Sequence, residues 1–146
     1  MKFGIIAVLL AAVFFQNSVA SSCYGKNVEV IVINGIGMTG DGLLRPDPYV
    51  EVTIGDLSKK TRVIHSTRNP FWYQELLFNN VDSNEMTIDV WDRDSGFRGS
   101  DDHIGSCTED LSSHYDEYVL VECHVAKNGI VNLKYKCYGN SQEEEY

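Results

Sequence analysis

The sequence is poor in positive charge. Its 146 residues hold 12 Lys and Arg against 21 Asp and Glu, which gives a formal net charge of −9 at pH 7. Clustered cations are needed to hold a phosphate backbone, so this balance argues against a nucleic-acid partner. Because anionic lipid also repels an acidic protein, any membrane contact must depend on something that reverses the local charge.

The sequence also lacks an apolar run long enough to cross a bilayer. The longest run covers residues 3–15, which is shorter than the ~20 residues that a membrane helix needs. It follows Lys2 and precedes the small and polar stretch 16–20, so we interpret residues 1–20 as a secretory signal peptide cleaved after Ala20. A buried N-terminal helix is disfavoured because the run has no polar residues at helical spacing. We therefore expect a secreted, extracellular protein.

The remaining length suits one domain. A chain of this size can bury one core without a structural metal, so we assign residues 21–139 to a single domain. Residues 140–146, which include three consecutive glutamates at 143–145, are expected to form an acidic tail outside the fold.

Cysteines are few, but their number is even, and a secreted chain is expected to pair them. Cys107 and Cys123 lie in consecutive predicted strands, whereas Cys23 precedes the first strand and Cys137 ends the last. Among the three possible connectivities we therefore favour 107 with 123 and 23 with 137. The chain has no C-x-x-C pair, and its four histidines show no ligand spacing with the cysteines, which argues against zinc.

Helical periodicity is almost absent after Cys23. Short alternating runs are separated by Gly, Pro, Asn and Asp clusters, which is typical of an all-β sandwich. Alternation is clear in Val28, Val30 and Val32. We predict an eight-stranded antiparallel β-sandwich with strands at Val28–Asn34, Tyr49–Ile54, Thr61–His65, Tyr73–Phe78, Met86–Trp91, His103–Thr108, Tyr118–Cys123 and Ile130–Cys137, and one helical turn at Glu109–Tyr115.

The aspartates concentrate in two predicted loops. One loop is glycine-rich and follows the first strand, and the other follows the strand that ends at Trp91. A single pair of aspartates could be a turn former only, but charges this dense in two loops repel one another unless a cation lies among them. Carboxylate oxygens without nitrogen or sulfur ligands favour calcium. The candidate metal ligands are Asp41, Asp47, Asp92, Asp94, Asp101 and Asp102.

The segment D-R-D-S-G at 92–96 also resembles the start of an EF-hand loop. If Asp92 is position 1, position 6 is Phe97, where glycine is required for the turn. Position 12 is His103, where a bidentate glutamate is required. The sequence therefore argues against an EF-hand.

A wider set of motifs points to another calcium architecture. The set comprises Asp41, D-P-Y-V-E-V at 47–52, N-P-F-W at 69–72, V-W-D-R-D at 90–94 and I-G at 104–105. Together these residues resemble a C2 domain over about residues 25–137. Within that family the chain is similar to the C-terminal C2 domain of perforin, through G-S-C at 105–107, its partner Cys123, and N-G-I-V-N-L-K-Y-K-C at 128–137. Perforin's large pore-forming domain has no counterpart in these residues, so pore formation is not carried over.

The resemblance implies calcium ligands at Asp41 and Asp47 in the first loop and at Asp92, Asp94 and Asp102 in the third. The stretch between Asp94 and Ile104 is two residues longer than the family pattern, so Asp101 remains an alternative to Asp102. The resemblance also implies the circularly permuted, type II topology. In that topology the first and last strands lie side by side, which supports the pairing of Cys23 with Cys137.

These features predict a calcium-binding domain that docks on anionic or zwitterionic phospholipid membranes once two or three Ca²⁺ reverse the charge of its loops. Apolar residues set among the glycines and acids are the expected membrane contacts: Met38, Leu43, Leu44 and Phe97. The alternative is a calcium-dependent module for an extracellular protein, such as an accessory of a perforin-like pore-former. An enzyme is not expected, because the chain lacks G-x-S-x-G and H-E-x-x-H.

Overall fold

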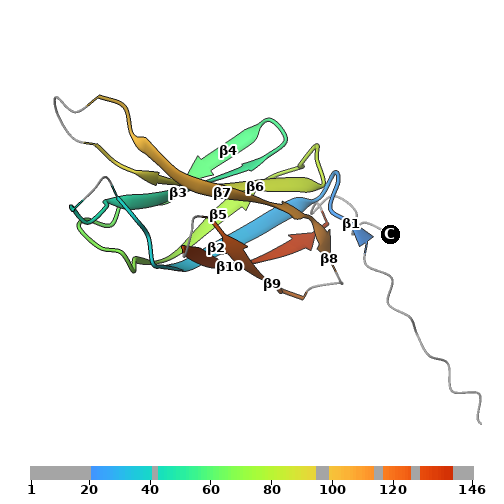
Figure 1. The fold of residues 1–146 in the computed structure, drawn as a ribbon. Coiled ribbons are helices and arrows are strands. Elements are labelled where there is room, and N and C mark those ends of the chain that lie inside the picture. Colours follow the sequence, from blue (N-terminus) through green and yellow to red (C-terminus); the bar gives the residue numbers. More distant parts are fainter. Residues whose placement is uncertain (1–20, 41–42, 95–98, 114–116, 126–128, 140–146) are drawn as a thin grey trace, which may run out of the picture.

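Two four-stranded antiparallel sheets pack face to face in the computed structural model, which describes residues 21–40, 43–94, 99–113, 117–125 and 129–139 (Figure 1). Those ranges contain no helix long and apolar enough to cross a membrane. The strands are β1 (Ser21–Ser22), β2 (Asn27–Ile36), β3 (Pro48–Ile54), β4 (Leu57–Lys60), β5 (Phe71–Phe78), β6 (Glu85–Asp92), β7 (Asp102–Asp110), β8 (Ser112–Ser113), β9 (Val119–His124) and β10 (Ile130–Tyr138).

The strand order is β5-β2-β10-β9 in one sheet and β4-β3-β6-β7 in the other, with β1 and β8 forming a small separate pair. The first long strand, β2, therefore lies beside the last, β10, with Val28 opposite Cys137. This is the type II arrangement, and the prediction of an antiparallel β-sandwich is confirmed.

The core lies between the two sheets because alternate side chains of each long strand point inward. Val28, Val30 and Val32 of β2 are fully buried, as are Val50 of β3 and Ile88 of β6. The largest fully buried side chains include Trp72 and Tyr135. Because their buried faces fix the strands, the ends of the loops that connect them have defined positions at the ends of the sandwich.

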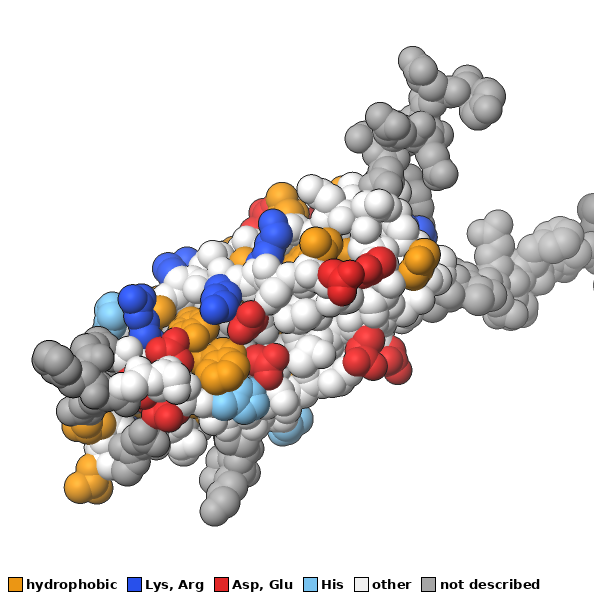
Figure 2. Space-filling model, turned by 90° about the horizontal axis from the view of Figure 1, so that it is seen from above, with side chains coloured by type: hydrophobic (Ala, Val, Ile, Leu, Met, Phe, Trp, Pro, Cys, Tyr) orange, Lys and Arg blue, Asp and Glu red, His pale blue; other side chains and the backbone are white. Residues whose placement is uncertain are grey.

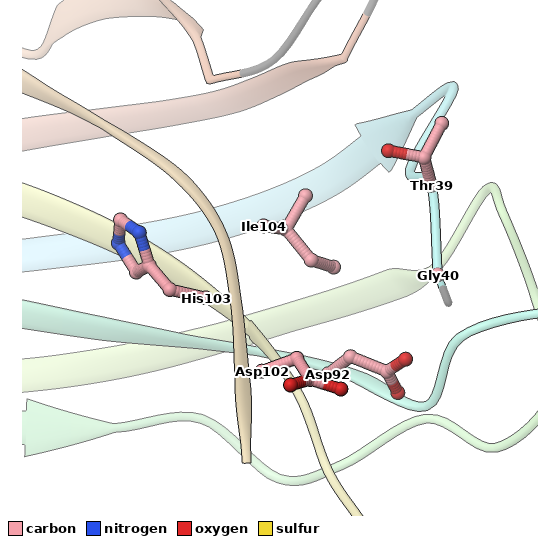
Figure 3. Close-up of a pocket in the computed structure, with 6 residues that line it drawn as sticks. All are labelled: Thr39, Gly40, Asp92, Asp102, His103 and Ile104. Atoms are coloured by element: carbon pink, nitrogen blue, oxygen red, sulfur yellow. The ribbon is translucent and has the colours of Figure 1, made fainter. Parts of the chain in front are cut away.

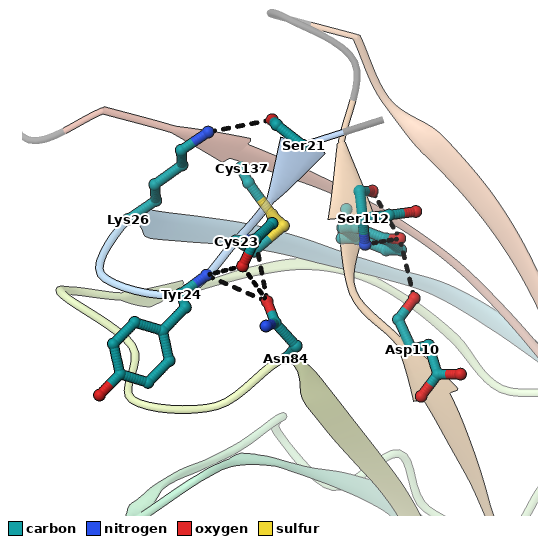
Figure 4. The surroundings of a disulfide bond; sticks show 10 residues. Ser21, Cys23, Tyr24, Lys26, Asn84, Asp110, Ser112 and Cys137 are labelled. Carbon is teal, nitrogen blue, oxygen red and sulfur yellow. Dashed lines mark hydrogen bonds between the residues drawn. A yellow bond between two sulfur atoms is a disulfide. The ribbon is translucent and has the colours of Figure 1, made fainter. Parts of the chain in front are cut away.

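Two disulfides tie the fold together. Cys23 is bonded to Cys137 of β10, and Cys107 of β7 is bonded to Cys123 of β9, so the second bond joins one sheet to the other. The first bond closes a long loop and contributes roughly 4–5 kcal/mol in the chain-entropy model. The Asn84 carboxamide oxygen accepts hydrogen bonds from the amides of Cys23 and Tyr24 beside that bond (Figure 4).

The strand predicted at Thr61–His65 is wrong. The chain instead forms a hairpin from β3 to β4, with Ile54 opposite Leu57 and the two-residue turn beginning at Gly55, whose φ is +58°. A glycine at that position of a two-residue loop favours such a hairpin. All four side chains of β4 are exposed, so this strand shows none of the alternation on which the sequence prediction depended.

The helical turn predicted at Glu109–Tyr115 is also wrong in the part that the structure describes. Strand β7 continues to Asp110, and Ser112–Ser113 pair with β1. The Tyr135 hydroxyl accepts a hydrogen bond from the Ser112 amide at 3.1 Å and donates to the Ser112 carbonyl at 2.9 Å. These tertiary contacts hold the segment extended. Tyr115 lies outside the described residues.

Candidate metal centre

Three connecting segments start and finish at one end of the sandwich, as their flanking strands show. They are residues 37–47 between β2 and β3, 61–70 between β4 and β5, and 93–101 between β6 and β7, and this end lies opposite the Cys23–Cys137 bond (Figure 1). The sequence predicted that the aspartates would concentrate in the first and the third of these segments.

A cluster of three carboxylates forms where β6 ends and β7 begins. Asp92, Asp94 and Asp102 each offer an oxygen, and these atoms all lie within 4.8 Å of one another. Asp92 and Asp102 are opposite each other in the β6–β7 ladder, and Asp92 is only 8% exposed. Three carboxylates this close repel one another strongly unless a cation lies among them.

The structure brings Asp102 into this cluster and turns Asp101 away. Successive residues of an extended chain point to opposite faces, and Asp101 lies on the outer face of the sheet with Tyr49. The Tyr49 hydroxyl donates to Asp101 Oδ2 at 2.5 Å, and the Asp94 amide donates to Asp101 Oδ1 at 3.1 Å. The hydrogen bond from Tyr49 lowers the pKa of Asp101, while burial and the Asp101 carboxylate raise the pKa of Tyr49.

Asp47 supports the cluster through its backbone. Its amide donates to Asp92 Oδ1 at 2.8 Å, and its carbonyl accepts from the Arg93 amide at 3.0 Å. The Asp47 side chain accepts from the Ser66 amide at 2.6 Å, and His65 Nδ1 lies 3.8 Å from the same oxygen. Asp47 is not among the three clustered carboxylates, and Asp41 lies outside the described residues.

The segment 61–70 organises the site, although the sequence predicted a strand over part of it. Its backbone pairs with the first loop: the Met38 amide donates to the Arg68 carbonyl at 2.8 Å, and the Gly37 amide donates to Asn69 Oδ1 at 3.0 Å. The N-P-F-W motif that begins at Asn69 was the available signal.

A cavity of about 180 Å³ opens beside the cluster (Figure 3). It is lined by Thr39, Gly40, Asp92, Asp102, His103 and Ile104. A Cβ atom at Gly40 would lie 3.1 Å from Asp92 Oδ2, so the first loop passes over the buried carboxylate at close range. The loop and the strand ends thus form the walls of one acidic hollow.

The four predicted membrane contacts fall into three groups. Met38 is fully buried in the core, so its assignment as a membrane contact is wrong; its Cε lies 3.1 Å from where a Gly35 Cβ would be, so the side chain uses the space that this glycine leaves. Leu43 is 99% exposed and Leu44 is 58% exposed. Phe97 lies outside the described residues.

The donor set of the cluster fits calcium. All three ligands are carboxylates, and such oxygens suit a hard divalent cation. The nearby His103 ring is directed elsewhere: its Nε2 lies 2.8 Å from Asp89 Oδ1, and the ring packs edge-on against Trp91 at 4.7 Å. No cysteine contributes, because all four are in disulfides.

Fold and site together define a family. The C2 domain model matches residues 26–127, and the chain belongs to the C2 domain family. This is a family of calcium- and phospholipid-binding modules. The two antiparallel sheets and the acidic cluster at one end of this chain agree with that membership.

Individual relatives come from several kinds of protein. Human perforin-1 is 30% identical over 111 residues, which are 74% of this chain and 19% of perforin-1. Mouse multiple C2 and transmembrane domain-containing protein 1 is 33% identical over 61% of this chain and 8% of its own length. Rice GTPase activating protein 1 (subspecies japonica) is 35% identical over 71% of this chain and 62% of its own length. The chain therefore spans only a small part of the two animal relatives.

Solved structures share the fold. One isolated C2 domain has a TM-score of 0.67 and 23% identity, over 77% of this chain and 97% of that one. The calcium-bound pair of C2 domains from extended synaptotagmin 2 has a TM-score of 0.63 and 19% identity, over 78% of this chain and 46% of that one. This similarity establishes the fold alone.

Proposed function

We propose that this chain is a secreted C2 domain that binds Ca²⁺ at its acidic end and docks there on phospholipid membranes in a calcium-dependent way. The observation that carries the proposal is the cluster of Asp92, Asp94 and Asp102, one of which is buried. Two further points support secretion: residues 1–20 read as a signal peptide, and two disulfides suit an oxidising compartment.

The three clustered aspartates would hold the metal together with Asp47 and Asp41 of the first loop, in a shell for two or three ions. Without metal, these carboxylates repel anionic headgroups. Bound Ca²⁺ supplies positive charge and open coordination positions for phosphate oxygens. The exposed Leu43 and Leu44 lie in the same first loop, where they can enter the bilayer interface.

The purified domain should bind two or more Ca²⁺ with dissociation constants around 10⁻⁴ to 10⁻³ M, the range of extracellular modules. Because ligand that binds only the folded state stabilises it, the melting temperature should rise with calcium concentration. Isothermal titration calorimetry measures the first effect and differential scanning calorimetry the second. The assignment fails if several millimolar Ca²⁺ gives neither heat nor a shift in melting temperature, or if Mg²⁺ matches its effect.

Vesicle sedimentation tests the membrane step. The domain should sediment with phosphatidylserine vesicles in Ca²⁺ and stay in the supernatant in EGTA, with phosphatidylcholine vesicles as the comparison. Calcium binding without sedimentation on either lipid would favour the alternative, a calcium-dependent extracellular protein-binding module. The similarity to perforin-1 makes an accessory of a perforin-like pore-former one form of that alternative.

Leu43→Ala with Leu44→Ala should weaken calcium-dependent vesicle binding by roughly 5- to 150-fold, because about 1–3 kcal/mol of apolar burial is lost. Calcium affinity in the absence of lipid should not change. The matched control is Leu120→Ala on β9, where the side chain is 78% exposed but distant from the three loops. Equal losses in the two variants would contradict the assignment of the first loop as the membrane contact.

A non-catalytic role is part of the proposal. The described residues offer no cysteine thiol as a nucleophile beside the clustered carboxylates, since all four cysteines are in disulfides. The His103 ring is engaged with Asp89. Carboxylates of this kind bind a metal and do not by themselves provide a base and nucleophile for hydrolysis.

A further inference from the structure

Asp94 differs from the other two members of the acidic cluster in how it is held. Asp92 ends β6 and Asp102 begins β7, so the strand ladder fixes both. Asp94 lies two residues beyond the end of β6, outside any strand. Its amide donates to Asp101 Oδ1 at 3.1 Å, across the base of the loop that connects β6 to β7.

Asp101 is in turn held by Tyr49 of β3. Its other oxygen, Oδ2, accepts from the Tyr49 hydroxyl at 2.5 Å. Tyr49 lies in β3 and is only 7% exposed, and Lys60 Nζ lies 5.7 Å from its ring centroid. A buried aromatic ring on a central strand is a rigid support, because few rotamers remain open to it.

The surroundings compensate the charge of Asp101. Tyr49, Lys60, Thr61, Val63, Arg93, Asp94 and Asp101 line a hollow of about 430 Å³ on the outer face of the sheet. Figure 2 looks down on this sheet and shows acidic, basic and apolar side chains gathered at one end of this face. Both carboxylate oxygens of Asp101 thus have donors, and the nearby positive charges of Arg93 and Lys60 compensate its negative charge.

We propose that Tyr49 and Asp101 are positioning residues: they form a clasp that holds Asp94 in place for the calcium site. This inference rests on the proposed function. The clasp bridges the two ends of the connection between β6 and β7, and it makes Asp101 a support for the site beside the ligand Asp102. A ligand that is held before binding costs less entropy when the ion arrives, so the clasp raises calcium affinity.

Tyr49→Phe is the sharpest test, because it removes one hydroxyl and no charge. We expect calcium affinity to fall about five- to tenfold by calorimetry, with the number of bound ions unchanged. In the calcium-free protein, hydrogen exchange of the Asp94 amide should become faster. The control is Tyr118→Phe, which also removes a tyrosine–carboxylate bond, to Glu29 on the other sheet, and should change neither quantity.

A double-mutant cycle separates the clasp from general loss of structure. Tyr49→Phe should reduce affinity in the wild-type background and have no further effect in Asp101→Ala, because the hydroxyl acts only through that carboxylate. If the losses of calcium affinity in Tyr49→Phe and Asp101→Ala add, the clasp is overturned. Loss of one bound ion in Asp101→Asn would also overturn it, because that loss would show that Asp101 is itself a calcium ligand. If the wild type binds Ca²⁺ and Tyr49→Phe binds it equally well, the clasp alone is overturned. If the wild type binds no Ca²⁺, the proposed function and the clasp are overturned together.

Discussion

Asp92→Asn together with Asp94→Asn should abolish calcium-dependent binding to phosphatidylserine vesicles while the domain remains folded. The two changes remove charged ligands from the cluster and keep the size of the side chains. The carboxamide oxygen that Asp92→Asn introduces can still accept the Asp47 amide, which holds Asp92 in the wild type at 2.8 Å. Sedimentation in Ca²⁺ and in EGTA measures the effect, and circular dichroism checks the fold.

The same variant should have an altered calcium dependence of stability. Without Ca²⁺ its melting temperature should equal or exceed that of the wild type, because repulsion within the cluster is relieved. With Ca²⁺ the wild type should become the more stable protein, because only its site fills. Asp56→Asn with Asp110→Asn is the charge-matched control, since both aspartates are exposed at the opposite end of the sandwich. If the cluster variant still sediments in a calcium-dependent way, the third loop does not bridge to lipid and the protein-binding alternative gains.

The sandwich was predictable because its long strands bury one face. In β2 the alternation of Val28, Val30 and Val32 shows directly which side chains enter the core. Strand β4 has no buried face, and only the turn at Gly55 marks it, so a prediction based on alternation placed that strand further along the chain. Local pattern fails where a segment is held by its neighbours and not by its own buried side chains.

The site was predictable in residue type but not in detail. Aspartate density indicated a cation, yet the choice between Asp101 and Asp102 depends on which face each occupies at the start of β7. The pairing of β6 with β7 decides which face each aspartate occupies. In that pairing a register shift between Val90 and Trp91 leaves Ile104 as an extra residue. Met38 was assigned to the membrane contact because the glycines around it indicate an exposed loop. The sequence does not show that Gly35 leaves space inside the core, which the Met38 side chain fills.

Gly105→Ala should strongly destabilise the domain. Gly105 follows the extra residue of β7, and a Cβ atom there would lie 1.4 Å from the Val125 carbonyl oxygen. That oxygen is part of the backbone beyond β9, where Val125 is buried and its amide donates to the Gly129 carbonyl at 2.9 Å. The sheets are also joined nearby by Cys107 and Cys123. The strand ends cannot separate locally, so relief of the clash must disturb both sheets.

We expect Gly105→Ala to cost about 3 kcal/mol or more, at or above the upper end of ordinary overpacking, because a backbone atom and not a flexible side chain is displaced. For a domain of this size that cost lowers the melting temperature by roughly 10 °C. Thermal and urea denaturation measure the loss, with both disulfides intact. Gly139→Ala is the control, because no atom lies within 4 Å of its Cβ position. Equal stability of the two variants would show that β7 does not pack against the Val125 carbonyl as described, and would remove the physical reason for glycine in the I-G motif.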